Sequence, residues 1–210
     1  MNTGKQLAVS DPATQLDLVA RCQKGDKDAL GELYRLYRGE VARNLHRMLG
    51  PGRADLDDVL QEVFIEVFRS IARFRGDAKV TTWLYRVCVN VALQRLRKRK
   101  RRNEVSTDDV AEPAPNDGGE TPERSLDNRR RLDAVYRILD ELSPKKRVVF
   151  ILHEIEGREP KEIAGIVGAP VLTVRTRLHY ARKEFYALAA TDARLDGGPK
   201  GPSASDGGAT

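Results

Sequence analysis

The sequence of 210 residues is short of several features that define whole classes of protein. Its two cysteines, Cys22 and Cys88, stand apart with no Cys-x-x-Cys pair and no nearby histidine, so we predict neither a zinc site nor another metal or cofactor. No apolar run is long enough to span a bilayer, and segment 1–15 lacks the apolar stretch and cleavage pattern of a secretory signal. Aromatic residues make up 6%, so any core is mostly aliphatic. These absences predict a protein of the reducing cytoplasm.

Positive charge is what the sequence has in excess, with 37 Lys and Arg residues against 31 Asp and Glu residues and a net charge of +6. The pI near 9.4 favours a polyanionic partner but does not separate nucleic acid from an anionic membrane. The segment Phe74–Arg102 has ten basic residues against the single Asp77, a charge of +9. A cationic helix beside a loop with amide and hydroxyl groups suits a phosphate backbone held next to exposed bases. The alternative is a solvated helix end or a basic tail.

Helical signals dominate the chain from Thr14, and we predict an all-α protein with two small helical domains. The first domain spans residues 14–102 and the second spans residues 124–190. Between them, residues 103–123 contain seven acidic residues, three prolines and no Lys or Arg, which predicts a flexible acidic linker. The Gly-, Ala- and Ser-rich residues 191–210 are expected to be a disordered tail.

The most regular helix of the first domain is expected from Asp57 to Ile71, and its two faces differ sharply. One face is an apolar stripe directed at a core, whereas the opposite face has Ile65 at the centre of acid and amide groups. A partner helix with cationic side chains would pair with the carboxylates, hydrogen-bond to the amide and pack on Ile65. The alternatives are a solvated face with one exposed Ile, or a metal site. The metal site would use four acidic residues without a histidine: Asp57, Asp58, Glu62 and Glu66.

The second domain carries the signals of a helix-turn-helix. Ser143 and Pro144 predict the N-cap and first turn of a helix over 145–154, and Pro160 starts a short helix that ends at Val167. The turn at 168–170 leads into a helix over 171–190, whose outward arc is basic and polar. Such side chains read base edges and phosphates in a major groove. The alternative is an ordinary helical hairpin with a basic face.

Three motifs in series carry a resemblance to a known family. They are DDVLQEVFIEVF at 57–68, FRGDAKVTTWLYRVCVN at 74–90 and EPKEIAGIVGAPVLTVRTRLHYAR at 159–182. Together they resemble the extracytoplasmic-function (ECF) sigma factors of bacterial RNA polymerase. The resemblance implies a non-enzymatic initiation factor that binds core RNA polymerase, directs it to promoters and helps open the DNA. It also implies an anti-sigma protein as a further partner.

The resemblance assigns roles to three sets of residues. The first set would bind core polymerase: Asp58, Gln61, Glu62 and Ile65. The second set would hold the melted −10 element: Phe74, Arg75, Gly76, Asp77, Lys79, Thr82, Trp83, Arg86, Asn90 and Arg97. The third set would read the −35 element as duplex: Leu172, Thr173, Arg175, Thr176, Arg177, His179, Arg182 and Lys183.

The chain departs from the family pattern at three positions. Gln94 stands where an Asp is usual, Glu159 stands where a Ser or Thr caps the helix, and Leu172 stands where a small residue is usual. These departures affect the promoter sequence that would be read rather than the class of protein. Two other classes of protein share part of this pattern. A stand-alone helix-turn-helix regulator would not need the helix at 57–71, and a recombinase or nuclease would need a catalytic cluster. The three histidines, at positions 46, 153 and 179, are scattered along the sequence.

Overall fold

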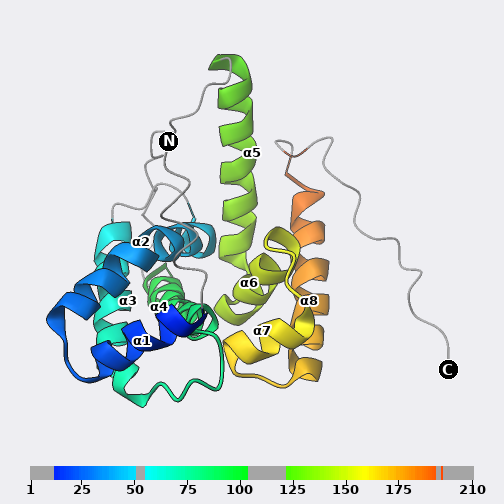
Figure 1. Ribbon diagram of the computed structural model, residues 1–210. Coiled ribbons are helices and arrows are strands. Elements are labelled where there is room, and N and C mark those ends of the chain that lie inside the picture. Colours follow the sequence, from blue (N-terminus) through cyan, green and yellow to red (C-terminus); the bar gives the residue numbers. More distant parts are fainter. Residues whose placement is uncertain (1–11, 51–54, 104–121, 193–194, 196–210) are drawn as a thin grey trace.

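The structure, a computed structural model, describes residues 12–50, 55–103, 122–192 and 195 (Figure 1). Every regular element of this described part is helical, which confirms the predicted all-α class. The predicted linker and tail fall almost entirely outside the described residues. None of the described helices is both long and apolar enough to cross a bilayer.

The N-terminal unit consists of four α-helices and one 3₁₀ turn. These elements are α1 (Pro12–Gln23), α2 (Lys27–Leu49), α3 (Leu56–Ser70), η1 (Ile71–Arg73) and α4 (Val80–Asn103). The apolar stripe predicted for α3 is buried and faces α2 and α4, as the periodicity required. It consists of Leu60, Val63, Phe64, Val67 and Ile71.

A break between α1 and α2 was not predicted from the sequence. Gly25 adopts a left-handed φ of +81°, which reverses the chain direction. The carboxylate of Asp26 then caps α2 by accepting hydrogen bonds from the backbone N–H groups of Asp28 (2.9 Å) and Ala29 (3.1 Å). The expected single helical run is therefore two helices that pack on each other.

The C-terminal unit consists of four α-helices, with a π-turn between the second and third. Its elements are α5 (Pro122–Glu141), α6 (Pro144–Phe150), η2 (Ile151–Ile155), α7 (Pro160–Val167) and α8 (Val171–Ala189). Ser143 occupies the predicted N-cap of α6, but its side chain accepts no hydrogen bond, so Pro144 at the first position defines the start. The helix predicted for 145–154 becomes a π-turn from Ile151, where the N–H of Glu156 donates to the Ile151 carbonyl (3.1 Å).

The two units pack directly on each other. Helix α4 contacts both α6 and α7, and Figure 1 shows α1–α4 side by side with α6–α8. One apolar core runs through both units, since Val148, Leu152 and Ile163 of the C-terminal unit belong to the same buried cluster as Leu84 and Val91 of α4. This shared core places the candidate sites of the two units close to each other.

Candidate functional sites

The outer face of α3 is exposed, with an apolar centre. Asp58 and Gln61 are exposed, and the Ile65 side chain is 48% exposed. Glu62 is only half-exposed because Arg95 of α4 lies 2.7 Å from its carboxylate. Phe68, 36% exposed and one turn beyond Ile65, enlarges the apolar centre and was missed because the periodicity placed it on neither face. Among the described residues no group of His, Cys, Asp and Glu could hold a metal ion, and this includes the acidic side chains of α3.

The loop before α4 presents cations around an aromatic pair. Arg75, Gly76, Asp77 and Lys79 are exposed, and Gly76 has a left-handed φ of +78°. The rings of Phe74 and Trp83 lie 5.2 Å apart between centroids, and both are half-buried, as is Thr82.

Gln23 of α1 holds this loop in place and was not singled out from the sequence. Its side-chain amide donates to the backbone carbonyls of Ile71 (3.0 Å) and Phe74 (2.8 Å). No local pattern in the sequence indicates this contact, because Gln23 is separated by 48 positions from Ile71 and by 51 positions from Phe74.

The helical part of the predicted −10 surface faces the C-terminal unit. The guanidinium of Arg86 donates to the backbone carbonyl of Gly165 in α7 at 2.6 Å. Asn90 and Arg97 line a cavity of ≈ 250 Å³ together with Arg177 of α8 and Lys145 of α6. Residues predicted for the two different promoter elements thus meet at one cavity.

The basic arc predicted for α8 lies at the surface. Leu172 is 74% exposed, Thr173 is half-buried, and the hydroxyl of Thr176 donates back to the Leu172 carbonyl (2.9 Å). Arg182 pairs with Glu154 at 2.6 Å. Three further predicted residues are exposed: Arg175, His179 and Lys183.

Glu159 occupies the N-cap position of α7 in place of the usual Ser or Thr. The carboxylate of Glu162, three residues later, accepts a hydrogen bond from the backbone N–H of Glu159 at 3.1 Å, as in a capping box. This departure from the family pattern therefore preserves the start of the helix-turn-helix.

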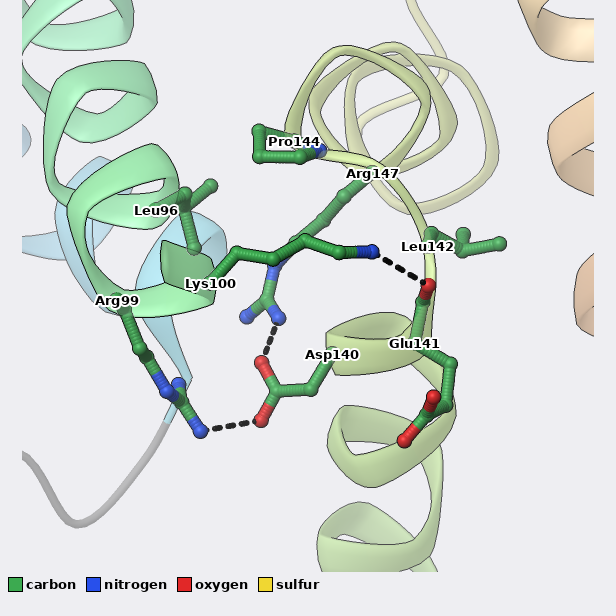
Figure 2. A pocket seen from close by; sticks show the side chains of 8 residues that line it. All are labelled: Leu96, Arg99, Lys100, Asp140, Glu141, Leu142, Pro144 and Arg147. Atoms are coloured by element: carbon green, nitrogen blue, oxygen red, sulfur yellow. Dashed lines mark hydrogen bonds and ion pairs between the residues drawn. The ribbon is translucent and has the colours of Figure 1, made fainter. Parts of the chain in front are cut away.

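Sequence reasoning missed a charged cluster at the boundary between the units. Arg147 of α6 is 1% exposed and donates to the backbone carbonyls of Met48 (2.9 Å) and Leu49 (3.0 Å) at the end of α2. It also pairs with Asp140 of α5, whose second oxygen lies 2.6 Å from Arg99 of α4, as Figure 2 shows. Burial lowers the pKa of the Arg147 guanidinium, and the charge of Asp140 opposes that shift.

One sequence signal could have revealed Arg147. It lies three residues before Phe150 and four before Ile151, and in a helix this spacing places Arg147 on the same face as these two apolar residues.

A second polar cluster at the boundary is centred on Glu156. Its side chain is only 5% exposed and accepts from the hydroxyl of Tyr85 at 2.7 Å. Arg47 of α2 (3.4 Å) and Arg158 (3.0 Å) flank the same carboxylate. Burial, followed by the hydrogen bond to Glu156, raises the pKa of the Tyr85 hydroxyl far above its ordinary value.

Comparison with known families defines the class of protein. Residues 33–102 match Sigma-70 region 2, and residues 132–185 match Sigma-70 region 4. The first match covers most of the N-terminal unit and the second covers the helix-turn-helix, so the chain has the two modules of a sigma factor.

Comparison with individual proteins identifies the group of sigma factors to which the chain is similar. The chain is 35% identical over 181 residues to the ECF RNA polymerase sigma-E factor of Escherichia coli K12, covering 83% of this chain and 94% of that protein. It is 37% identical over 182 residues to the ECF sigma-E factor of Haemophilus influenzae, covering 83% and 95%. The chain belongs to the ECF sigma factors: it is an initiation factor that binds core RNA polymerase, directs it to specific promoters and helps open the DNA.

Two solved structures share the fold. CnrH in complex with the cytosolic domain of CnrY matches with a TM-score of 0.56 and 24% identity, over 85% of this chain and 99% of that one. The sigma factor RpoE in complex with the anti-sigma factor NepR, from Bartonella quintana, matches with a TM-score of 0.54 and 19% identity, over 77% and 97%.

Proposed function

We propose that three surfaces divide the work of this initiation factor. The outer face of α3 binds core polymerase, the 74–79 loop with α4 holds the melted −10 element, and α8 reads the −35 element in duplex form. The factor acts in the cytoplasm by binding alone, with no chemistry of its own. The observation that carries the proposal is the exposure of three chemically different patches on separate elements of one chain.

Docking through α3 is supported by the composition of its exposed face. Ile65 and Phe68 form an apolar centre, and Asp58 and Gln61 lie exposed on the same helix. A soluble helix gains nothing from exposing two large apolar side chains next to each other, whereas a partner helix with Arg or Lys would bury them and pair with the carboxylates. The opposite face of α3 is already buried in the core.

Capture of the −10 element is supported by the loop before α4. Exposed Arg75 and Lys79 supply charge for phosphates, and the half-buried Phe74 ring offers a stacking surface. A surface that holds extruded bases binds the melted state better than duplex, so it shifts the equilibrium toward opening without catalysis.

Reading of the −35 element is supported by α8. Arg175 and Lys183 are exposed cations suited to phosphates, and His179 can reach base edges. The exposed Leu172 is available for contact with thymine methyl groups.

An anti-sigma protein is proposed as a partner that holds the factor inactive. The support is that CnrH was solved with the cytosolic domain of CnrY and RpoE with the anti-sigma factor NepR.

A charge reversal on α3 tests the docking proposal. Asp58→Lys is expected to abolish co-purification with core polymerase and promoter-specific transcription in vitro, because a lysine would face the cationic partner helix. Asp17→Lys, which makes the same change at another exposed helical position, is the matched control and should behave as wild type. Equal polymerase retention by both variants would place the docking site elsewhere.

A further inference from the structure

We propose that the cavity shared by α4, α6 and α8 is a binding site for a nucleoside polyphosphate, meaning a single nucleoside that carries two or more linked phosphates. Three cations line this cavity, its most buried lining residues are aliphatic, and its volume is ≈ 250 Å³. The proposal goes beyond the division of polymerase and DNA binding among the surfaces described above.

The charge of the cavity is of one sign. Arg97 of α4, Lys145 of α6 and Arg177 of α8 line it, and the described residues around it include no Asp or Glu. Like charges gathered in a hollow repel one another more than they do on a flat surface, because solvent screens them less. An anion bound among the three cations would replace this repulsion with attraction.

The three cations also lack partners. Within the described part of the chain none of them makes a hydrogen bond or an ion pair. Their neighbours behave differently: Arg95 and Arg99, two residues to either side of Arg97, pair with carboxylates at 2.7 Å and 2.6 Å. Lys146, next to Lys145, pairs with a carboxylate as well. The fold therefore supplies acids for the adjacent cations and leaves those of the cavity available to a ligand.

The number and kind of these cations favour linked phosphates. A guanidinium presents paired donors to two oxygens of one phosphate, and an ammonium acts as a point charge. A single terminal phosphate carries about −1.5 to −2 charges at neutral pH, so it leaves three cations incompletely balanced. A DNA strand spreads its charges along its length. Two or more phosphates joined directly place enough charge inside one small cavity.

The apolar part of the cavity suits the flat face of a nucleobase. Leu93 is 8% exposed and Val148 is 1% exposed, and the half-buried Val167 and Ala169 lie beside them in the lining. Small-molecule sites combine such apolar walls with a few polar groups. The side-chain amide of Asn90, which also lines the cavity, can donate to and accept from the edge of a base.

The size of the cavity limits the ligand. Pockets that enclose drug-sized molecules have volumes of ~300–1,000 Å³. A cavity of ≈ 250 Å³ is slightly smaller, so it accommodates one nucleotide whose outer part stays in solvent.

Isothermal titration calorimetry of the full-length chain with ADP tests the site, with inorganic pyrophosphate as a probe that lacks the nucleoside. Lys145→Gln is the main variant. Lys145 belongs to none of the sets proposed for polymerase or DNA, and it is exposed, so the substitution should leave the fold intact. Lys146→Gln is the matched control, because it removes the same charge from the next position of α6 but does not line the cavity.

Wild type and Lys146→Gln are expected to bind ADP equally well, and Lys145→Gln about fivefold more weakly, because one charge-assisted contact is lost. Lys145→Arg keeps the charge and should bind within about twofold of wild type. Equal weakening in Lys145→Gln and Lys146→Gln would reveal general surface attraction and overturn the site. Binding to wild type only at millimolar ADP would overturn it too.

Two further comparisons define the ligand. Pyrophosphate should bind about fivefold more weakly than ADP, because it buries no base against the aliphatic wall. Equal affinity for the two probes would overturn the nucleoside part of the proposal. Fluorescence anisotropy with labelled oligo(dT) should give the same affinity for Lys145→Gln and Lys146→Gln. A loss confined to Lys145→Gln, without ADP binding to wild type, would assign the cavity to nucleic acid instead.

Neither readout involves polymerase or a promoter. Absence of ADP binding would therefore refute this site and leave the proposed initiation surfaces standing, whereas failure of promoter-specific transcription would leave the site untouched.

Discussion

Gly50, directly after α2, is the position where one added methyl group should have the largest calculable effect. Its backbone adopts φ +99° and ψ 166°, a combination that is essentially restricted to glycine. A Cβ at this position would lie 2.9 Å from the Cδ1 atom of Tyr136, closer than van der Waals contact allows. The Tyr136 hydroxyl also donates to the Arg47 carbonyl at 3.1 Å, so the ring is fixed across the unit boundary.

The expected cost of Gly50→Ala follows from these contacts. Backbone strain costs ~1–3 kcal/mol, and the reduced freedom of the unfolded chain returns ~0.4–1 kcal/mol. Displacement of the Tyr136 ring adds about 1 kcal/mol for the hydrogen bond to Arg47. We therefore expect a loss of roughly 1–3.5 kcal/mol in the free energy of unfolding.

Urea unfolding followed by circular dichroism measures this loss, with Gly25→Ala as control. Gly25 also has a left-handed φ, +81°, but an added Cβ would meet no atom within 4 Å, so only the backbone contribution applies. In a Tyr136→Leu background, Gly50→Ala should become less costly because part of the clash is gone. Equal losses for Gly50→Ala and Gly25→Ala would refute the argument that Tyr136 packs against this glycine.

Three further outcomes are expected from the surfaces and caps. Arg175→Ala and Lys183→Ala should each lower the salt dependence of duplex binding by about one unit of slope, because each removes a phosphate contact; an unchanged slope in both would mean that neither side chain touches DNA. Phe74→Ala should leave polymerase binding intact but reduce permanganate reactivity of thymines near the start site, and equal reactivity would contradict base capture there. Asp26→Ala should lower the melting temperature by removing the cap of α2. The backbone N–H of Ala29 holds the pKa of the Asp26 carboxyl below its usual value, so the cap stabilises above that group's unfolded pKa. The difference from wild type should therefore shrink as the pH falls through the folded pKa, and a difference that persists in acid would exclude the cap.

The sequence was informative where a pattern repeats along one element. The stripe from Leu60 to Ile71 and the exposed position of Ile65 follow from helical periodicity, and the start of α7 at Pro160 follows from local turn chemistry. These features depend on neighbours within a few residues, so a single sequence contains them. The predicted exposure of the arc on α8 has the same origin.

Contacts between distant segments could not be predicted in this way. Periodicity indicates that Arg147 faces inward but not that it meets carbonyls 98 and 99 residues earlier. In the same way, the sequence identifies Arg86 as a surface cation, whereas the structure shows its guanidinium on the Gly165 carbonyl. The packing of the two units on each other joins segments that are far apart in the sequence, and no local pattern encodes it.

The exposed face of α3 lies away from the contacts between the two units, because the helix packs on α2 and α4 through its opposite face. A partner that docks on Asp58, Gln61 and Ile65 would therefore displace no contact between the units. Binding at α3 and rearrangement of the units are, on this geometry, separable steps.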